Sequence, residues 1–378
     1  MHSTARFIAF FIVFIGTWAG MNAYVLSRLW NLSVLQSQSA HRILLALFFL
    51  LWAVFPLAHI LGHRSPSNLS WLLEIVGGFW MGFVFIALAL FFFADVLTGF
   101  GWLFREYVPA VRWSALALTA LFSVWGVVNG LRSPVIRRYE VPLAGLPASL
   151  DGTIAVQLSD LHLGTVLGER WLERLWSQVQ GIRPDVVFMT GDIFDGNATH
   201  AEKLVPVLKK WQVPWGVWAV TGNHEYYAGL EESVAVLKSA GYQVLRDESV
   251  VVRPGLNLAG VDDLSARREF GETIAPIRQA LARRDTGPTI LLSHSPLRVE
   301  EAAREHVTLM LSGHTHSGQI WPFGHVVKLV YPYLVGRYEV GGMTLWVSRG
   351  TGTWGPRMRL FAPSEILVFT LRSTGAEA

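Results

Sequence analysis

Residues 154–162, which read Ile-Ala-Val-Gln-Leu-Ser-Asp-Leu-His, decide the fold class of the second half of this chain. A short apolar run, typical of a buried β-strand, ends there in the polar side chains Asp160 and His162. The same pattern recurs in the runs 185–190, 216–221, 289–292 and 307–311. Segments with helical periodicity, 169–180 and 230–240, lie between them. Strands that alternate with helices predict an α/β layered fold.

Side chains of the types that can bind metal ions follow each of the five predicted strands. They are Asp160 and His162, then Asp192 and Asp195, then Asn223 and His224, then His294, and finally His314 and His316. Because α/β sheets place ligand sites at the carboxyl ends of their strands, we expect one shared site. Carboxylates, an amide and imidazoles without a thiolate suit Mn, Fe or Zn, and the size of the set suits two ions about 3.5 to 4 Å apart.

The motifs resemble the calcineurin-like metallophosphoesterase superfamily over about residues 150–372. Its five elements are matched in order by Asp160-Leu-His162, Gly191-Asp192-Ile-Phe-Asp195, Gly222-Asn223-His224-Glu225, His294 and Gly313-His314-Thr-His316. Each element alone also fits a turn, a helix cap or a hydrogen-bonded core histidine, whereas the complete ordered set favours the family. Residues 157–164 and 313–319 are most similar to the membrane-associated bacterial subgroup that includes YkuE and YaeI. The resemblance implies an α/β/β/α sandwich.

The resemblance also implies a role for each residue. One metal ion is bound by Asp160, His162 and His316, the other by Asn223, His294 and His314, and Asp192 bridges the two. His224 stabilises the transition state or protonates the leaving oxygen, and Asp195 orients His224. The implied cofactors are two divalent transition-metal ions, with Mn, Fe and Zn left open. The implied reaction is hydrolysis of a phosphoester or pyrophosphate bond by metal-activated hydroxide.

Four uncharged or nearly uncharged apolar runs, 7–26, 43–61, 71–93 and 113–131, precede this domain. As helices they reach roughly 28 to 35 Å, enough to cross a bilayer core of about 30 Å. We therefore expect a transmembrane region at 1–132, a linker at 133–150, a catalytic domain at 151–372 and a tail at 373–378. A cleaved signal peptide is the alternative for the first run. His59, Glu74 and Asp95 are expected to reach water at the ends of the runs.

Charge is divided unevenly between the two halves. Residues 1–140 hold nine Arg and four acidic residues, a net of +5, and the remainder holds 22 basic and 24 acidic residues, a net of −2. The basic excess therefore lies beside the spans, and no nucleic-acid partner is expected. Five Arg lie on the side shared by the N-terminus and the catalytic domain and four on the other, which favours the cytoplasmic side of a bacterial inner membrane for a multi-pass protein. The absence of cysteine excludes disulfides and thiolate ligands.

The sequence indicates the identity of the substrate less clearly than the type of reaction. Residues 319–334 are unusually aromatic and apolar, which suggests either a rim that admits a lipid-linked phosphate from the bilayer or a hairpin whose aromatics fill the core. The resemblance to subgroup relatives that act on nucleotide-linked or phospholipid-derived substrates supports the first interpretation. Residues 350–357 form a glycine-rich loop, and Arg357 stays outside the expected site. Two other functions remain open: a metal-binding membrane sensor or scaffold, and a transporter with a regulatory phosphoesterase-like domain.

Overall fold

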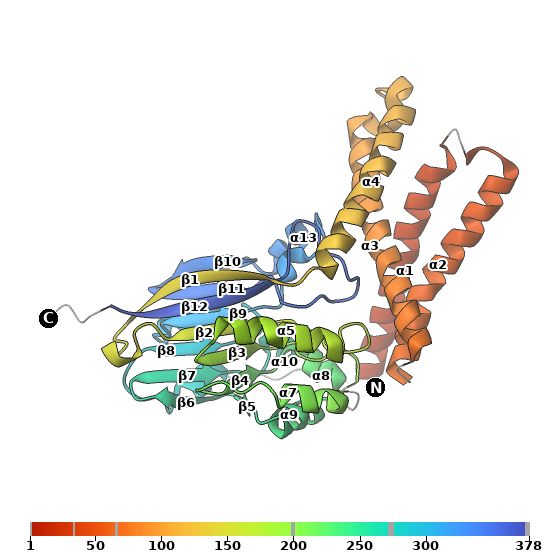
Figure 1. Ribbon diagram of the computed structural model, residues 1–378. Coiled ribbons are helices and arrows are strands. Elements are labelled where there is room, and N and C mark those ends of the chain that lie inside the picture. The colour runs from red at the N-terminus through yellow and green to blue at the C-terminus, as the bar shows by residue number, and fades with distance from the viewer. Residues whose placement is uncertain (1, 33–34, 65–66, 198–200, 271–275, 375–378) are drawn as a thin grey trace. The chain divides into compact units, whose positions relative to one another are not determined.

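The computed structural model describes residues 2–374 except 33–34, 65–66, 198–200 and 271–275, and it describes no side chains at 2–11, 59–64 and 268–270. The chain forms two units (Figure 1). The first comprises Met1–Leu131, Ile320–Pro322 and Gly355–Leu360. The second comprises Arg132–Gln319, Phe323–Trp354 and Phe361–Ala378.

Long helices make up most of the first unit. They are α1 (His2–Trp30), α2 (Gln38–Arg64), α3 (Asn68–Leu97) and α4 (Val108–Leu131), with the short 3₁₀ turns η2 (Gly99–Gly101) and η3 (Arg105–Tyr107) before α4. Among the described residues, three stretches are long and apolar enough to cross a membrane: Gln38–Ala58, Asn68–Leu97 and Arg105–Leu131. The predicted span 7–26 falls within α1, and its residues 7–11 lie outside the described side chains. Four crossings therefore remain a prediction.

Two short segments from far along the chain pack against α3 and α4 within the first unit. Residues 320–322 and 355–360, here called the returning segments, include Met358 and Leu360, each only 1% exposed. The backbone N–H of Arg359 donates to the carbonyl of Gly126 at 2.8 Å. A side chain at Gly130 would meet the carbonyl oxygen of Arg357 at 2.4 Å, so glycine is required there. The returning segment 355–360 thus packs along the last turns of α4.

Asp95, near the end of α3, is buried rather than exposed to water. It is 2% exposed, and it accepts hydrogen bonds from Arg28 Nε at 2.6 Å and the Tyr24 hydroxyl at 2.7 Å. Arg112 lies 3.4 Å away on its other oxygen. The expectation that Asp95 reaches water is therefore wrong, because charge-assisted hydrogen bonds within the unit offset the cost of burying it. His59 lies outside the described side chains.

The second unit contains two six-stranded sheets. The first has the order β1-β12-β2-β3-β4-β5 and the second β10-β11-β9-β8-β7-β6. The first sheet consists of β1 (Val135–Ala144), β12 (Glu365–Thr374), β2 (Ile154–Leu158), β3 (Val186–Thr190), β4 (Val217–Val220) and β5 (Gln243–Val244). The second consists of β10 (Gly336–Val340), β11 (Met343–Val347), β9 (Leu309–Ser312), β8 (Thr289–Leu292), β7 (Leu256–Gly260) and β6 (Glu248–Arg253).

The helices of this unit are short. They are η4 (Ala148–Leu150), α5 (Glu169–Ile182), η5 (Glu202–Leu204), α7 (Val205–Leu208), α8 (Asn223–Ala228), α9 (Leu230–Ser239), α10 (Leu264–Phe270), α11 (Pro276–Leu281), α12 (Val299–Arg304), η6 (His316–Gly318) and α13 (Phe323–Val330).

Alternation of side chains along the strands builds a layered core. In β2, Ala155 belongs to a buried cluster that contains residues of both sheets, such as Phe188 and Ile290. Its neighbour Val156 belongs to a different cluster, shared with α5, α7 and α9. A third cluster joins the second sheet to α11 and α12. Since successive strand residues point to opposite faces, two facing sheets are covered by helices on their outer sides, as the α/β metallophosphoesterase fold requires.

The five expected strands agree with β2, β3, β4, β8 and β9 to within two residues at their ends. The expected linker 133–150, however, contains β1, which pairs in parallel with β12 along ten residues. Its alternation was obscured by charged residues such as Arg137 and Arg138, which lie at the sheet edge. We propose that the catalytic domain begins at this strand.

Candidate metal centre

The predicted ligands meet where parallel strands end. Strands β2, β3 and β4 are parallel to one another, as are β7, β8 and β9. The loops after β2 and β3 run side by side, because the N–H groups of Asp160 and His162 donate to the carbonyls of Gly191 and Asp192, both at 3.0 Å. The Gln157 amide joins the two sheets by donating to the Ser312 carbonyl at 2.9 Å. Ligands from both sheets are thereby held at one edge.

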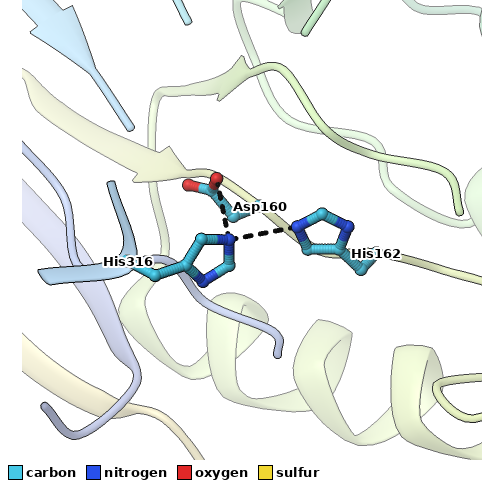
Figure 2. A group of neighbouring side chains, drawn as sticks. All are labelled: Asp160, His162 and His316. Atoms are coloured by element: carbon cyan, nitrogen blue, oxygen red, sulfur yellow. Dashed lines mark hydrogen bonds and ion pairs between the residues drawn. The ribbon is translucent and has the colours of Figure 1, made fainter. Parts of the chain in front are cut away.

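The first group of donors consists of Asp160, His162 and His316 (Figure 2). Nε2 of His316 lies 3.3 Å from Oδ1 of Asp160 and 3.1 Å from Nε2 of His162. All three side chains are buried. The expected first set of ligands is therefore brought together, although His316 is separated from the others by more than 150 residues.

The second group consists of Asp192, His294 and His314. Nε2 of His294 lies 3.0 Å from Oδ2 of Asp192 and 3.2 Å from Nδ1 of His314. Oδ1 of Asn223 lies 2.9 Å from the same His314 nitrogen, so the amide belongs to this group as expected. Nδ1 of His294 donates to the Thr190 carbonyl at 2.7 Å, which leaves its Nε2 lone pair directed at the group.

Asp192 lies between the two groups. Its Oδ2 is 3.0 Å from His294 Nε2 in the second group and 3.8 Å from His162 Nε2 in the first. Its Oδ1 accepts the backbone N–H of His224 at 2.9 Å. This central position is the one that the sequence predicts for a bridging carboxylate.

His224 and Asp195 form a pair at the side of the centre. Nδ1 of His224 lies 3.2 Å from Oδ1 of Asp195, at a partly exposed position. Donor atoms of His162, Asp192 and His224 also lie within 4.8 Å of one another, so distance alone does not exclude His224 as a ligand. Its pairing with a carboxylate that belongs to neither donor group favours the expected catalytic role.

The backbone at this edge is held in an uncommon conformation. Asp160, His162, Asp192, His314 and His316 all have positive φ angles between 47° and 71°. Left-handed backbone costs a residue with a side chain about 1 kcal/mol or more, and such strain clusters at functional sites. Two glycines permit the close packing: a Cβ on Gly222 would lie 2.1 Å from Asp192 Oδ1, and one on Gly313 would lie 2.4 Å from Asp160 Oδ2.

Burial and neighbouring charge set the protonation of the imidazoles. Burial, helped by His224, lowers the pKa of His162 to about 3, and burial with His294 lowers the pKa of His314 to about 4. Burial would also lower the pKa of His224, but the carboxylates of Asp192 and Asp195 raise it to about 9. At neutral pH, His162 and His314 are therefore neutral and able to bind a cation, whereas His224 carries a proton.

The donor set fits divalent cations. Burial opposes the charge of Asp160 and Asp192, yet neighbouring histidines hold the pKa of both carboxyls well below the usual range. Within the part of the chain that the structure describes, the ion pairs of these two carboxylates are with imidazoles and with no Arg or Lys. Buried carboxylates that face imidazoles, without an Arg or Lys beside them, are surroundings that a bound metal ion stabilises.

Glu225 is a residue of this site to which the sequence interpretation gave no role. Its carboxylate is fully buried and accepts four backbone N–H groups: those of Gly222, Asp192, Ile193 and Phe194, at 2.7 to 3.0 Å. It thereby ties the loop after β4 to the loop after β3. The signal was present, because Glu225 closes the third motif, but its partners are backbone groups that no sequence pattern identifies.

Two further residues support the second donor group. The hydroxyl of Tyr331 lies 2.8 Å from Nε2 of His314, the ring nitrogen that faces away from Asn223. Asp263, which is fully buried, accepts a hydrogen bond from the hydroxyl of Ser295, the residue after His294. Asp263 lies three residues after the end of β7, so the strand-end pattern would have found it had that strand been predicted.

The two loops singled out in the sequence have different positions. Thr351 and Gly352 donate backbone hydrogen bonds to the carbonyls of Ser159 and Asp160, so this loop does lie against the donors. Arg357 belongs to the first unit. Residues 323–330 form the helix α13, and the alternative of a core-filling hairpin is wrong for them, because none of its residues is buried.

Comparisons with known proteins agree with this geometry. The family model described as calcineurin-like phosphoesterase matches residues 155–318. An uncharacterized metallophosphoesterase of Aquifex aeolicus is 36% identical over 243 residues, which cover 64% of this chain and 92% of that protein. The YkuE metallophosphoesterase of Bacillus subtilis is 32% identical over 241 residues, 61% of this chain and 82% of YkuE. The chain belongs to the calcineurin-like phosphoesterase family and is a metal-dependent phosphoester hydrolase.

Another relative combines this domain with a membrane region. A transmembrane protein with metallophosphoesterase domain from Danio rerio is 37% identical over 271 residues, 68% of this chain. The match spans only 62% of that relative's length. Together with the three apolar stretches, it indicates a membrane protein.

Proposed function

We propose that this protein is a membrane-anchored, binuclear metal-dependent phosphoesterase that hydrolyses a phosphoester or pyrophosphate bond on a lipid-linked substrate. The observation that carries the proposal is the position of Asp192 between two donor groups, each with two imidazoles. Asp160, His162 and His316 would hold one cation, and Asn223, His294 and His314 the other. When bound, two such cations neutralise phosphoryl charge and lower the pKa of water to supply hydroxide.

The chain's own residues supply the remaining chemistry. His224 is partly exposed, protonated at neutral pH and paired with Asp195, which suits a group that donates a proton to a leaving oxygen. Asp195 fixes the ring so that Nε2 faces away from the carboxylate. This arrangement argues against a sensor or scaffold, since neither needs a positioned proton donor.

The donor groups are accessible to solvent on the side where His224 lies. Asn223, His224 and His314 are partly exposed, whereas Asp160, His162 and His294 are buried. Tyr227 and Trp354, both more than half exposed, have rings 5.7 and 6.1 Å from His224. A substrate that enters from this side meets His224 and two aromatic surfaces, which supports a substrate with an apolar or planar group beside its phosphate.

Membrane anchoring is proposed through four helices in a bacterial inner membrane, with the catalytic domain on the cytoplasmic side. Four crossings place the N-terminus and the catalytic domain on one side, and five Arg against four favour the cytoplasm for that side. Protease treatment of intact cells and of inverted vesicles tests the orientation. Cleavage of the catalytic domain in intact cells would overturn it.

The function is tested with purified full-length protein reconstituted with Mn, Zn or Fe. The substrate panel contains phosphomonoesters, diesters, nucleotide-linked lipids and phospholipids. We expect hydrolysis that depends on metal and favours a lipid-linked member. If the metal-loaded protein hydrolyses no member, the enzymatic proposal is wrong.

A further inference from the structure

Helix α13 presents an apolar face to its surroundings. Val326, Leu329 and Val330 are 54%, 85% and 61% exposed, and no residue of the helix is buried. With 3.6 residues per turn, these three side chains lie on the face opposite Gly324. Three large apolar side chains exposed together on one short helix form a patch of the kind that marks an interaction site.

The opposite side of α13 lies against the turn that carries a predicted metal ligand. Helix α13 contacts η6, which begins at His316. A Cβ on Gly318 would lie 2.1 Å from the backbone nitrogen of Gly324, so the two backbones are in direct contact there. Beyond the end of the helix, Tyr331 reaches His314, and the Thr315 hydroxyl donates to the carbonyl of Leu334. Helix α13 and the loop 313–319 therefore form one packed structure.

The chain before α13 belongs to the apolar helices. Phe323, the first residue of α13, directly follows the returning segment 320–322 of the first unit. In that segment Ile320 is 6% exposed and pairs with Leu360 in a β-bridge. The other returning segment packs at Gly126 and Gly130, within the last six residues of α4. Helix α13 therefore begins one peptide bond beyond a segment that packs among the candidate membrane spans.

We propose that α13 lies on the surface of the lipid bilayer, with Val326, Leu329 and Val330 among the acyl chains. This inference rests on the proposed membrane anchoring and deepens the proposed function, because it places the loop of His314 and His316 next to lipid. Lys328, four residues after Gly324, lies on the side opposite the apolar face, where an interfacial helix carries its polar residues.

A lipid surface fits this face better than a second copy of the chain. A stable dimer buries about 800 Å² on each partner, and three side chains on an eight-residue helix supply much less. A bilayer has no such requirement, since each apolar group that enters it contributes separately and the spanning helices already hold the chain there.

The absence of cysteine makes a direct test possible. A single cysteine introduced as Leu329→Cys in the full chain is labelled with a nitroxide, and the protein is reconstituted into vesicles of phosphatidylcholine and phosphatidylglycerol. Electron paramagnetic resonance then compares collisions of the label with oxygen, which concentrates in lipid, and with a water-soluble nickel chelate. Val326→Cys repeats the measurement on the same face. Lys238→Cys, on the exposed side of α9, is the matched control.

We expect the oxygen-to-nickel collision ratio to be severalfold higher at positions 326 and 329 than at 238. Equal ratios at all three positions would place α13 in water and overturn the proposal. Spin–spin broadening at 329 that disappears on dilution with unlabelled protein would identify a second copy as the partner and also overturn it. None of these readouts depends on catalysis, so failure here is distinct from failure of the phosphoesterase proposal.

Discussion

The hydroxyl of Tyr331 lies 2.8 Å from Nε2 of His314, on the far side of the ring from Asn223 and His294. An imidazole whose Nε2 is engaged by a hydroxyl keeps its Nδ1 lone pair for the second donor group. Tyr331 is therefore a positioning residue: it acts through His314 and lies at the end of α13.

Removal of this hydroxyl should weaken metal binding. We expect Tyr331→Phe to lower the affinity of the second site for Mn or Zn about tenfold or more, the usual effect of losing such a partner. Isothermal titration of metal-free protein measures it. Tyr333→Phe is the control, because the Tyr333 hydroxyl donates to Glu300 instead. Equal metal affinities in Tyr331→Phe and in the wild type would show that Tyr331 does not position His314.

The pair of His224 and Asp195 should determine the alkaline limit of activity. The carboxylates raise the pKa of His224 to about 9, so its proton is present below that pH and lost as the pH rises through it. In Asp195→Asn this pKa falls toward the ordinary value of about 6.5, and the decline in rate moves to lower pH. A pH profile of kcat/KM, with Asp151→Asn as control, measures the shift. An unmoved alkaline limb would mean that His224 is not the proton donor.

Replacement of His224 itself should be more severe. We expect His224→Ala to lower kcat about 10²- to 10⁴-fold, the usual contribution of a positioned proton donor. Metal content should stay at the wild-type level, since His224 has no proposed ligand role. Loss of one metal equivalent together with activity would instead identify His224 as a ligand.

Glu225 should stabilise the fold of the site. Glu225→Ala leaves four buried backbone N–H groups without their acceptor, and we expect the free energy of unfolding to fall by about 2 kcal/mol or more. Chemical denaturation of metal-free protein separates this effect from metal binding. The control is Glu232→Ala at an exposed position of α9. A loss no larger than that of the control would contradict the structural role.

The apolar face of α13 should affect the turnover of lipid substrates and not that of soluble substrates. We expect Leu329→Asp to lower turnover of a phosphoester carried in vesicles about tenfold, since transfer of a Leu side chain from water is worth about 1.5 to 3 kcal/mol. Hydrolysis of a soluble chromogenic phosphomonoester should be unchanged. Equal loss on both substrates would contradict lipid delivery through this helix.

Local sequence was sufficient to predict which donor side chains come together. Each predicted ligand follows a short apolar strand, and strand direction alone brings Asp160 and His316 to one edge although they are distant in the chain. The supporting residues were not predictable in this way. Glu225 binds backbone groups, and Tyr331 lies in a segment whose apolar composition suggested either a rim or a hairpin. Their roles depend on packing, which periodicity does not encode.

The fold was predictable to a similar extent. Buried strands such as β8 are uninterrupted apolar runs, and the sequence pattern predicts them. The edge strand β1 was assigned to a linker, because charged residues interrupt its pattern and its pairing with β12 joins segments more than 200 residues apart. The burial of Asp95 could not be foreseen, since its partners Arg28 and Arg112 lie on other helices.

The metal content of the purified full-length protein tests the central claim most directly. We expect metal-free protein to bind two equivalents of Mn or Zn, with activity restored as they bind. Asp192→Asn should lose nearly all activity and bind metal more weakly, because it lacks the charge between the two groups. Saturation at one equivalent, or full activity after complete removal of metal, would contradict the account.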